Sequence, residues 1–186
     1  MTTPQAQVEV ELVQAFRFAV TLTASAAPRP AAVAQLSNGK FAECSGLELE
    51  ADVREYLEGG RNDGVVRRVG RVKLVPIVLK RGMFVGSPGG YADTQLWDWL
   101  TGMVRGVLPI PRYNGMVQVL APKVQMPAPN KSPREVARWT FTRGLPSKVT
   151  GPSLNAKTGE IAIEELHIVH EGLQLWKPKA NQGGGA

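Results

Sequence analysis

The densest group of side chains that could bind a metal ion or transfer protons lies near the C-terminal end of the sequence. It combines carboxylates and imidazoles: Glu164, Glu165, His167, His170 and Glu171. The Ile and Val residues around this group predict a strand, on which side chains three positions apart face opposite sides. His167 and His170 would then be badly placed for one metal ion. We therefore interpret the group as a solvated strand edge and not as a catalytic or metal site.

The single cysteine and the glycine-rich segments also lack the context that chemistry requires. Cys44 cannot form an internal disulfide, and one cysteine is too few for a zinc site. The sequence around it lacks the flanking glycines of a nucleophile elbow, which favours a buried, unreactive thiol. Gly59-Gly60 and the segment from Gly86 to Gly90 lack the strand-loop-helix frame of a phosphate-binding loop. The sequence therefore predicts no catalytic residue, no metal and no cofactor, so we expect the protein not to be an enzyme.

The length and the charge of the chain limit the classes of protein that remain. The chain has 186 residues, which fits one domain, and a net charge of +6, with basic residues densest from Arg61 to Lys80. Aromatic residues make up 6% of the chain and do not interleave with that basic stretch, as a stacking platform for single strands would need. The charge is interpreted as a solvated or subunit-facing surface. A nucleic-acid-binding β-barrel remains the alternative, and salt-sensitive DNA binding would reveal it.

No segment has the pattern of a signal peptide or of a membrane-spanning helix. Two-residue periodicity instead predicts a mainly β chain. The alternation is clear from Phe16 to Leu22 and again from Leu47 to Arg54, and a third strand is predicted at residues 71–79, with an edge or bulge at Pro76. Shorter strands are predicted at residues 116–120, 137–143, 161–169 and 173–176. Within residues 161–169 the apolar phase flips at Glu164 and Glu165, which predicts a β-bulge.

One helix and two proline-rich loops complete the predicted fold. Residues 94–105 have apolar side chains at helical spacing, with Asp93 or Thr94 as the cap, Gly106 as the stop and Trp97 in the core. The predicted fold has two packed antiparallel sheets, as a β-sandwich or barrel, with this helix. We expect an N-terminal arm at residues 1–14, a domain at 15–176 with loops at 24–38 and 121–133, and a flexible tail at 177–186.

Several segments, taken in order, resemble a known family. The segments are Phe41 to Leu47 (F-x-x-x-S-G-L), Glu55 to Gly60 (E-Y-x-x-G), Val78 to Phe84 (L-K-R-G), Leu96 to Leu100 (L-W-x-W), Trp139 to Lys148 (W-x-F with a later P-x-K) and Leu154 to Leu166 (E-I-A-I-E-x-L). Together they resemble the contractile phage tail tube proteins and the inner-tube proteins of extracellular contractile injection systems. Gly144 departs from the family's usual alanine, and the two loops are longer than in compact members.

The resemblance implies a structural role. Six copies would form a ring, and rings would stack into a conduit for DNA or protein cargo inside a sheath. The other partners would be the sheath protein and the baseplate hub or spike. The particle would be a phage tail or an extracellular injection particle assembled in the bacterial cytoplasm. A tube-initiator ring of the baseplate is the alternative role within the same family.

Charged and glycine residues in one region are the predicted self-assembly residues. They are Glu48, Glu50, Asp52, Glu55, Tyr56, Gly59, Gly60, Arg61, Arg67 and Arg68. The acidic face and the basic stretch could complement each other between subunits, or both could be ordinary solvated surface. The segment from Glu55 to Gly64 is the predicted ring-to-ring contact, and a mobile hairpin tip is the alternative.

Overall fold

The computed structural model describes residues 12–25, 35–38, 41–57, 59–60, 64–85, 90–121, 134–157 and 159–176. Much of the predicted loop at 24–38, nearly all of the loop at 121–133, most of the N-terminal arm and the whole tail at 177–186 lie outside these residues. No helix in the described ranges is long and apolar enough to cross a membrane.

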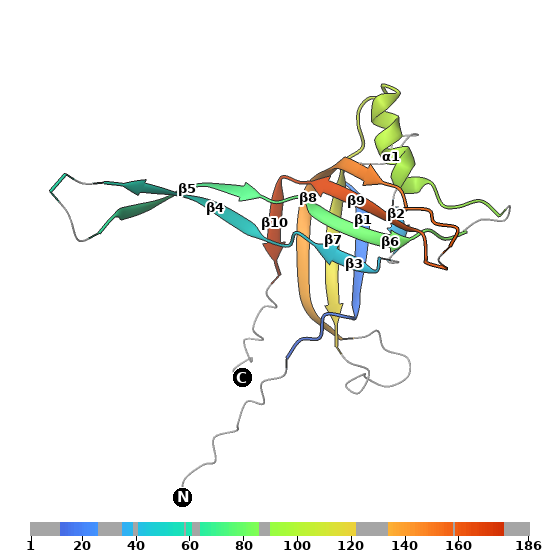
Figure 1. Ribbon diagram of the computed structural model, residues 1–186, viewed down its shortest axis with the longest axis horizontal. Coiled ribbons are helices and arrows are strands. Elements are labelled where there is room, and N and C mark those ends of the chain that lie inside the picture. The colour runs from blue at the N-terminus through green and yellow to red at the C-terminus, as the bar shows by residue number, and fades with distance from the viewer. Residues whose placement is uncertain are drawn as a thin grey trace, which may run out of the picture.

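Eight strands form one antiparallel sheet that folds back on itself (Figure 1). One half contains β2 (Gln35–Asn38), β1 (Phe18–Ala24), β7 (Tyr113–Leu120), the first part of β8 (Glu135–Thr150) and β10 (Gly172–Leu175). The other half contains the second part of β8, then β9 (Ile163–Val169), β6 (Ile77–Gly82) and β3 (Glu43–Ser45). The predicted mainly β fold with two antiparallel layers and one helix is confirmed.

Strand β8 passes from one half to the other through a bend. β7 pairs with it as far as Gly144, and β9 pairs with it from Leu145 onward. Arg143 at the bend has a φ of 53°. A Cβ on Gly144 would lie 2.8 Å from a methyl carbon of Ile168 and 2.9 Å from a ring carbon of Phe141, so even an alanine here requires its neighbours to move. The predicted strand at 137–143 is thus only the first part of a longer strand that continues through Pro146.

Apolar residues from both halves of the sheet form one core. Val20 and Leu22 of β1 point inward, as the sequence predicts, whereas Phe16 lies outside the strand and is exposed. They pack in one cluster with residues of the opposite half that include Leu79, Leu166 and Ile168.

Helix α1 (Gln95–Val104) closes one end of this core (Figure 1). Thr94 is its N-cap residue, and the carboxylate of the preceding Asp93 accepts the Gln95 N–H at 2.9 Å. Trp99 is the buried tryptophan at 4% exposure; its indole N–H donates to the Pro111 carbonyl at 2.9 Å and its ring meets Tyr113 edge-on. Trp97 is 38% exposed, so the prediction that it belongs to the core is wrong.

Three further sequence predictions are corrected by the sheet. The end of the predicted loop at 24–38 is strand β2, which pairs with β1. The predicted strand at 71–79 is two strands, β5 (Val66–Leu74) and β6, separated at Val75 and Pro76. The predicted bulge in 161–169 is wrong, because β9 pairs with β6 in continuous register from Ile163 to Ile168.

The apparent phase flip in β9 has a different cause. Glu164 is a core-facing position of β9 that carries a charge, and it pairs with the equally buried Arg81 of β6. A buried carboxylate at an apolar position looks like a change of phase in the sequence.

Candidate assembly surface

The acidic and histidine-rich segment that the sequence singled out is divided among several places in the fold. Glu164 lies in the core, and Glu165 and His167 lie on the outer face of β9. His170 bonds to the Val75 carbonyl through Nε2 at 3.2 Å. Glu171 pairs with Arg143 at 2.6 Å and also with Arg112. No cluster of at least three His, Cys, Asp or Glu side chains suited to a metal occurs among the described residues.

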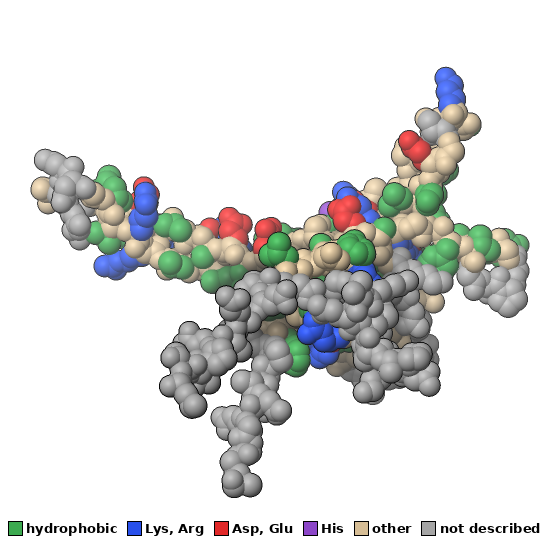
Figure 2. Space-filling model, turned by 90° about the horizontal axis from the view of Figure 1, so that it is seen from below, with side chains coloured by type: hydrophobic (Ala, Val, Ile, Leu, Met, Phe, Trp, Pro, Cys, Tyr) green, Lys and Arg blue, Asp and Glu red, His purple; other side chains and the backbone are tan. Residues whose placement is uncertain are grey.

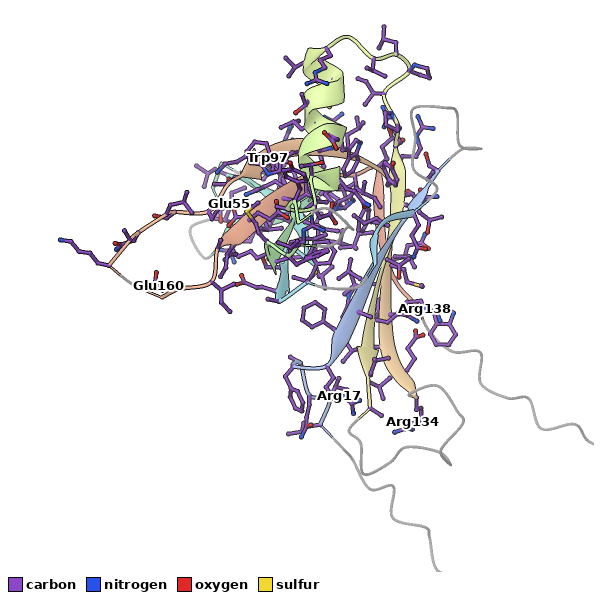
Figure 3. The ribbon with its side chains drawn as sticks, turned by 90° about the vertical axis from the view of Figure 1, so that its right-hand side faces the viewer. Arg17, Glu55, Trp97, Arg134, Arg138 and Glu160 are labelled. Carbon is purple, nitrogen blue, oxygen red and sulfur yellow. The ribbon has the colours of Figure 1, made fainter. Side chains whose placement is uncertain are left out.

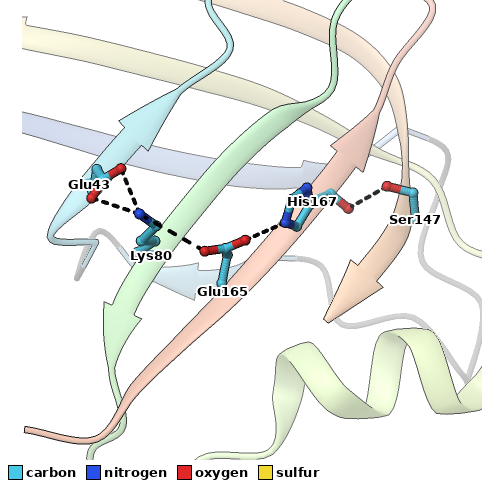
Figure 4. A network of polar contacts seen from close by, with 5 residues as sticks. All are labelled: Glu43, Lys80, Ser147, Glu165 and His167. Carbon is cyan, nitrogen blue, oxygen red and sulfur yellow. Dashed lines mark hydrogen bonds and ion pairs between the residues drawn. The ribbon is translucent and has the colours of Figure 1, made fainter. Parts of the chain in front are cut away.

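A network of polar side chains crosses the outer face of β3, β6 and β9 (Figure 4). Lys80 donates to Glu43 at 2.9 Å and lies 4.0 Å from Glu165, which contacts His167 in turn. The hydrogen bond from His167 lowers the pKa of Glu165, and the bond to Glu43 raises the pKa of Lys80. Opposite charges on neighbouring strands stabilise the pairing of those strands, so the network supports the sheet.

Cys44 lies on β3 beside this network. Burial, followed by the charge of Glu43, raises the pKa of its thiol to about 11. A thiolate is therefore scarce at neutral pH, in agreement with the predicted unreactive thiol.

The remaining two strands form a hairpin that projects from the folded sheet (Figure 1). Among the described strands β4 (Leu49–Tyr56) pairs with β5 alone, and the turn between them contains Gly59 and Gly60. We call β4, β5 and their turn the hairpin. In Figure 2 it extends as a narrow ridge with apolar side chains along it. A two-stranded ribbon alone is marginally stable in water. A projecting hairpin of this length is therefore suited to packing against the surface of another chain.

One face of the hairpin is apolar and exposed. Directly opposed residues are Leu49 with Leu74, Ala51 with Val72 and Val53 with Val69. Val53 is 57% exposed and Val69 is 72% exposed. Exposed apolar side chains that gather on one surface mark an interaction site, whereas isolated ones do not.

Charged residues occupy the opposite face and the outer end of the hairpin. Lys73 pairs with Asp52 at 2.7 Å, and Arg67 pairs with Glu55 at 2.9 Å. The Arg68 guanidinium lies 5.2 Å from the centre of the Tyr56 ring. Acidic and basic residues expected to meet between subunits thus meet, at least in part, within one chain.

The structure places most of the predicted assembly residues on this hairpin. Glu50, Asp52, Glu55, Tyr56, Arg67 and Arg68 lie on its strands, Gly59 and Gly60 in its turn, and Glu48 just before β4. Arg61 lies outside the described residues.

Sequence reasoning missed the apolar face of the hairpin. Val72 and Leu74 were assigned to a longer strand, and Val69 was not considered. The available signal was the turn at Gly59-Gly60 between two alternating runs, which predicts that β4 and β5 pair with each other.

Comparison with protein-family models gives one family. The family model described as T4-like virus tail tube protein gp19 matches residues 14–174. Comparison with curated proteins gives no match.

Solved structures give the same fold. A chain of the sheath-tube complex of an extracellular contractile injection system, PVC, in its extended state is 20% identical, with a TM-score of 0.66, over 94% of this chain and 99% of that one. A chain from the anti-feeding prophage cap structure is 19% identical, with a TM-score of 0.68, over 96% of this chain and 100% of that one. A type six secretion system protein is 12% identical, with a TM-score of 0.50, over 92% and 91% of the two chains.

Proposed function

The chain belongs to the T4-like virus tail tube protein family, and we propose that its copies form hexameric rings that stack into a conduit for cargo. It is a structural tube subunit, so its function is to assemble with other copies. The observation that carries the ring and stacking proposal is the apolar face of the projecting hairpin. Burying that face against another copy removes apolar surface from water, which is the dominant favourable term in most protein association.

The sheet supplies a second means of joining copies. Its path ends at β2 on one side and at β3 on the other, and both are short strands. An edge strand presents unpaired backbone groups, and pairing between neighbours in a closed ring satisfies them. The proposed partners beyond the chain itself are the sheath protein, the baseplate hub or spike, and DNA or protein cargo in the lumen. The proposed setting is a phage tail or an extracellular injection particle.

Negative-stain electron microscopy of the purified full-length chain tests the proposal. Rings with six subunits, or tubes built from them, are the expected result. A strict monomer that binds DNA tightly would overturn the proposal in favour of the nucleic-acid-binding barrel. Single rings that never stack would favour the tube-initiator role.

A variant with a polar hairpin face tests the observation itself. Val53→Ser combined with Val69→Ser removes the central apolar pair and leaves the folded sheet untouched. The expected result is loss of tubes with an unchanged circular dichroism spectrum, because among the described residues these two side chains pack within the hairpin and not on the folded sheet.

The matched control is Val104→Ser. Val104 is 84% exposed on α1 and lies outside the hairpin. The control variant should assemble like the unmodified chain. Normal tubes from the hairpin double variant would show that the apolar face is not the contact.

A further inference from the structure

The hairpin joins the folded sheet through two short crossings. The chain leaves β3 at Ser45 and enters β4 at Leu49, and it leaves β5 at Leu74 and enters β6 at Ile77. We call residues 46–48 and 75–76 the root of the hairpin. Two crossings without pairing of their own would ordinarily act as a hinge.

The two crossings touch each other at the root. Gly46 has a φ of +80°, and a Cβ at this position would lie 2.2 Å from the Pro76 carbonyl oxygen. No side chain fits there, and the positive φ disfavours any residue other than glycine. Pro76 restricts the other crossing, because its ring fixes φ near −65°. The root is therefore closely packed on the side of Gly46.

A histidine from a different part of the chain holds the second crossing. His170 follows β9, and its Nε2 lies 3.2 Å from the Val75 carbonyl oxygen. A carbonyl oxygen can only accept a hydrogen bond, so Nε2 must carry the proton. The other ring nitrogen, Nδ1, is buried and has no hydrogen-bond partner among the described residues. Because Nδ1 has no hydrogen-bond partner among the described residues, the bond to Val75 and the packing around the ring set the orientation of the ring.

The turn that carries His170 is itself firmly attached. The ring packs against Phe141, with centroids 5.6 Å apart. The next residue, Glu171, donates its backbone N–H to the Thr142 carbonyl at 3.0 Å, and its carboxylate pairs with Arg143 at 2.6 Å. The Val75 carbonyl is thus connected through His170 to the bend of β8, in the middle of the sheet.

We infer that His170 is a positioning residue, which together with Gly46 and Pro76 fixes the direction of the hairpin before another copy binds. This inference rests on the proposed assembly through the hairpin. A hairpin that already points in its bound direction loses less conformational entropy on docking. If a loosened root leaves the competent direction populated about one tenth of the time, apparent affinity falls about tenfold.

Distance measurements on the isolated subunit test the inference without requiring assembly. Spin labels at Leu57→Cys and Val104→Cys, in a Cys44→Ala background, report the position of the hairpin relative to α1, and both sites are highly exposed. Pulsed electron paramagnetic resonance should give a narrow distance distribution for the parent protein. His170→Phe keeps an aromatic ring against Phe141 but cannot donate to Val75, and it should broaden the distribution.

Two variants serve as controls. His170→Gln retains an N–H donor near the position of Nε2 and should keep the narrow distribution. His167→Phe changes the other histidine of the chain, whose side chain lies on the outer face of β9 and bonds to Glu165 and not to the root. This variant should also leave the distribution narrow. If His170→Phe fails to fold, Gly46→Ala loosens the root from the opposite side without touching Phe141 and should broaden the distribution equally.

Measurements of assembly then distinguish the proposed function from the positioning role of His170. In the unlabelled chain, His170→Phe should raise the concentration needed for tube formation about tenfold, whereas His170→Gln should not. A parent chain that forms neither rings nor tubes would count against the proposed function. A parent chain that assembles, with a distribution as narrow in His170→Phe and Gly46→Ala as in the parent, would overturn the positioning role.

Discussion

Arg81 and Glu164 form a fully buried ion pair between β6 and β9. They are direct cross-strand partners, Asp93 lies 3.5 Å from the same guanidinium, and the Phe84 ring lies 5.1 Å from it. Asp93 also accepts the N–H of Gln95, the first residue of α1, so the Arg81 guanidinium connects the sheet to the start of the helix. Neutralising Glu164 removes the carboxylate closest to the buried guanidinium and leaves Asp93, at 3.5 Å, as an acidic neighbour. We therefore expect Glu164→Gln to lower the free energy of unfolding by about 3 kcal/mol, measured by urea denaturation.

The adjacent glutamate is the control for that substitution. Glu165 sits one position along the same strand but on the outer face, where solvent screens its contacts with His167 and Lys80. Glu165→Gln should change the free energy of unfolding by less than about 1 kcal/mol. Equal effects of the two substitutions would mean that the buried pair contributes no more than a surface pair.

The hairpin is the element whose charges can be tested separately from its apolar face. Glu50→Lys together with Asp52→Lys removes the partner of Lys73 and places two cations on a face that already holds Arg54. A ribbon with one sign of charge along a face should repel a basic neighbouring copy, so we expect shorter tubes in electron micrographs.

Glu160→Lys with Lys157→Glu is the control for the charge reversal. These residues lie on the projecting loop between β8 and β9, where Figure 3 labels Glu160, and the exchange leaves the net charge unchanged. Tubes of normal length from the Glu50 and Asp52 variant would identify the charged face of the hairpin as ordinary solvated surface.

Element by element, the sequence predicted what depends on local pattern and missed what depends on distant contacts. The alternation of β1 and the extent of α1 were predicted because both periods are visible along the chain. The prediction that Trp97 belongs to the core failed because helical spacing alone does not show which tryptophan of the helix faces the core. What selects Trp99 is its hydrogen bond to Pro111 and its contact with Tyr113.

Part of the candidate assembly surface could be predicted from the sequence, because its acidic strand and its glycine turn are local features. Its apolar face exists because Val53 and Leu49 lie opposite residues of β5 and no other part of the described chain covers them. Alternation in a sequence does not distinguish a strand that packs on its own core from one that projects away from it. The role of His170 depends on a contact with Val75, far away in the sequence, and no local pattern reveals it.

At the scale of the whole molecule, charge and apolar burial act in opposite directions on assembly. Each copy carries a net charge of +6, so stacked copies repel one another. The hairpin ion pairs at Asp52 and Glu55 are already satisfied within one copy, which leaves the apolar face as the main attraction. Raising the salt concentration from about 0.1 M to about 1 M shortens the Debye length from about 10 Å to about 3 Å and screens the repulsion. We expect tube formation to begin at a lower protein concentration in high salt, measured by sedimentation.

The direction of this salt effect separates the physical causes of association. Attraction between acidic and basic surfaces of neighbouring copies would weaken as salt is added, and so would binding of the chain to nucleic acid. Apolar contact between like-charged copies strengthens instead. A sedimentation series on the Val53→Ser and Val69→Ser double variant completes the comparison. This variant keeps the repulsion but lacks the central apolar pair, so it should form no tubes at any salt concentration. Tubes of the double variant in high salt would show that the sheet edges alone hold the copies together.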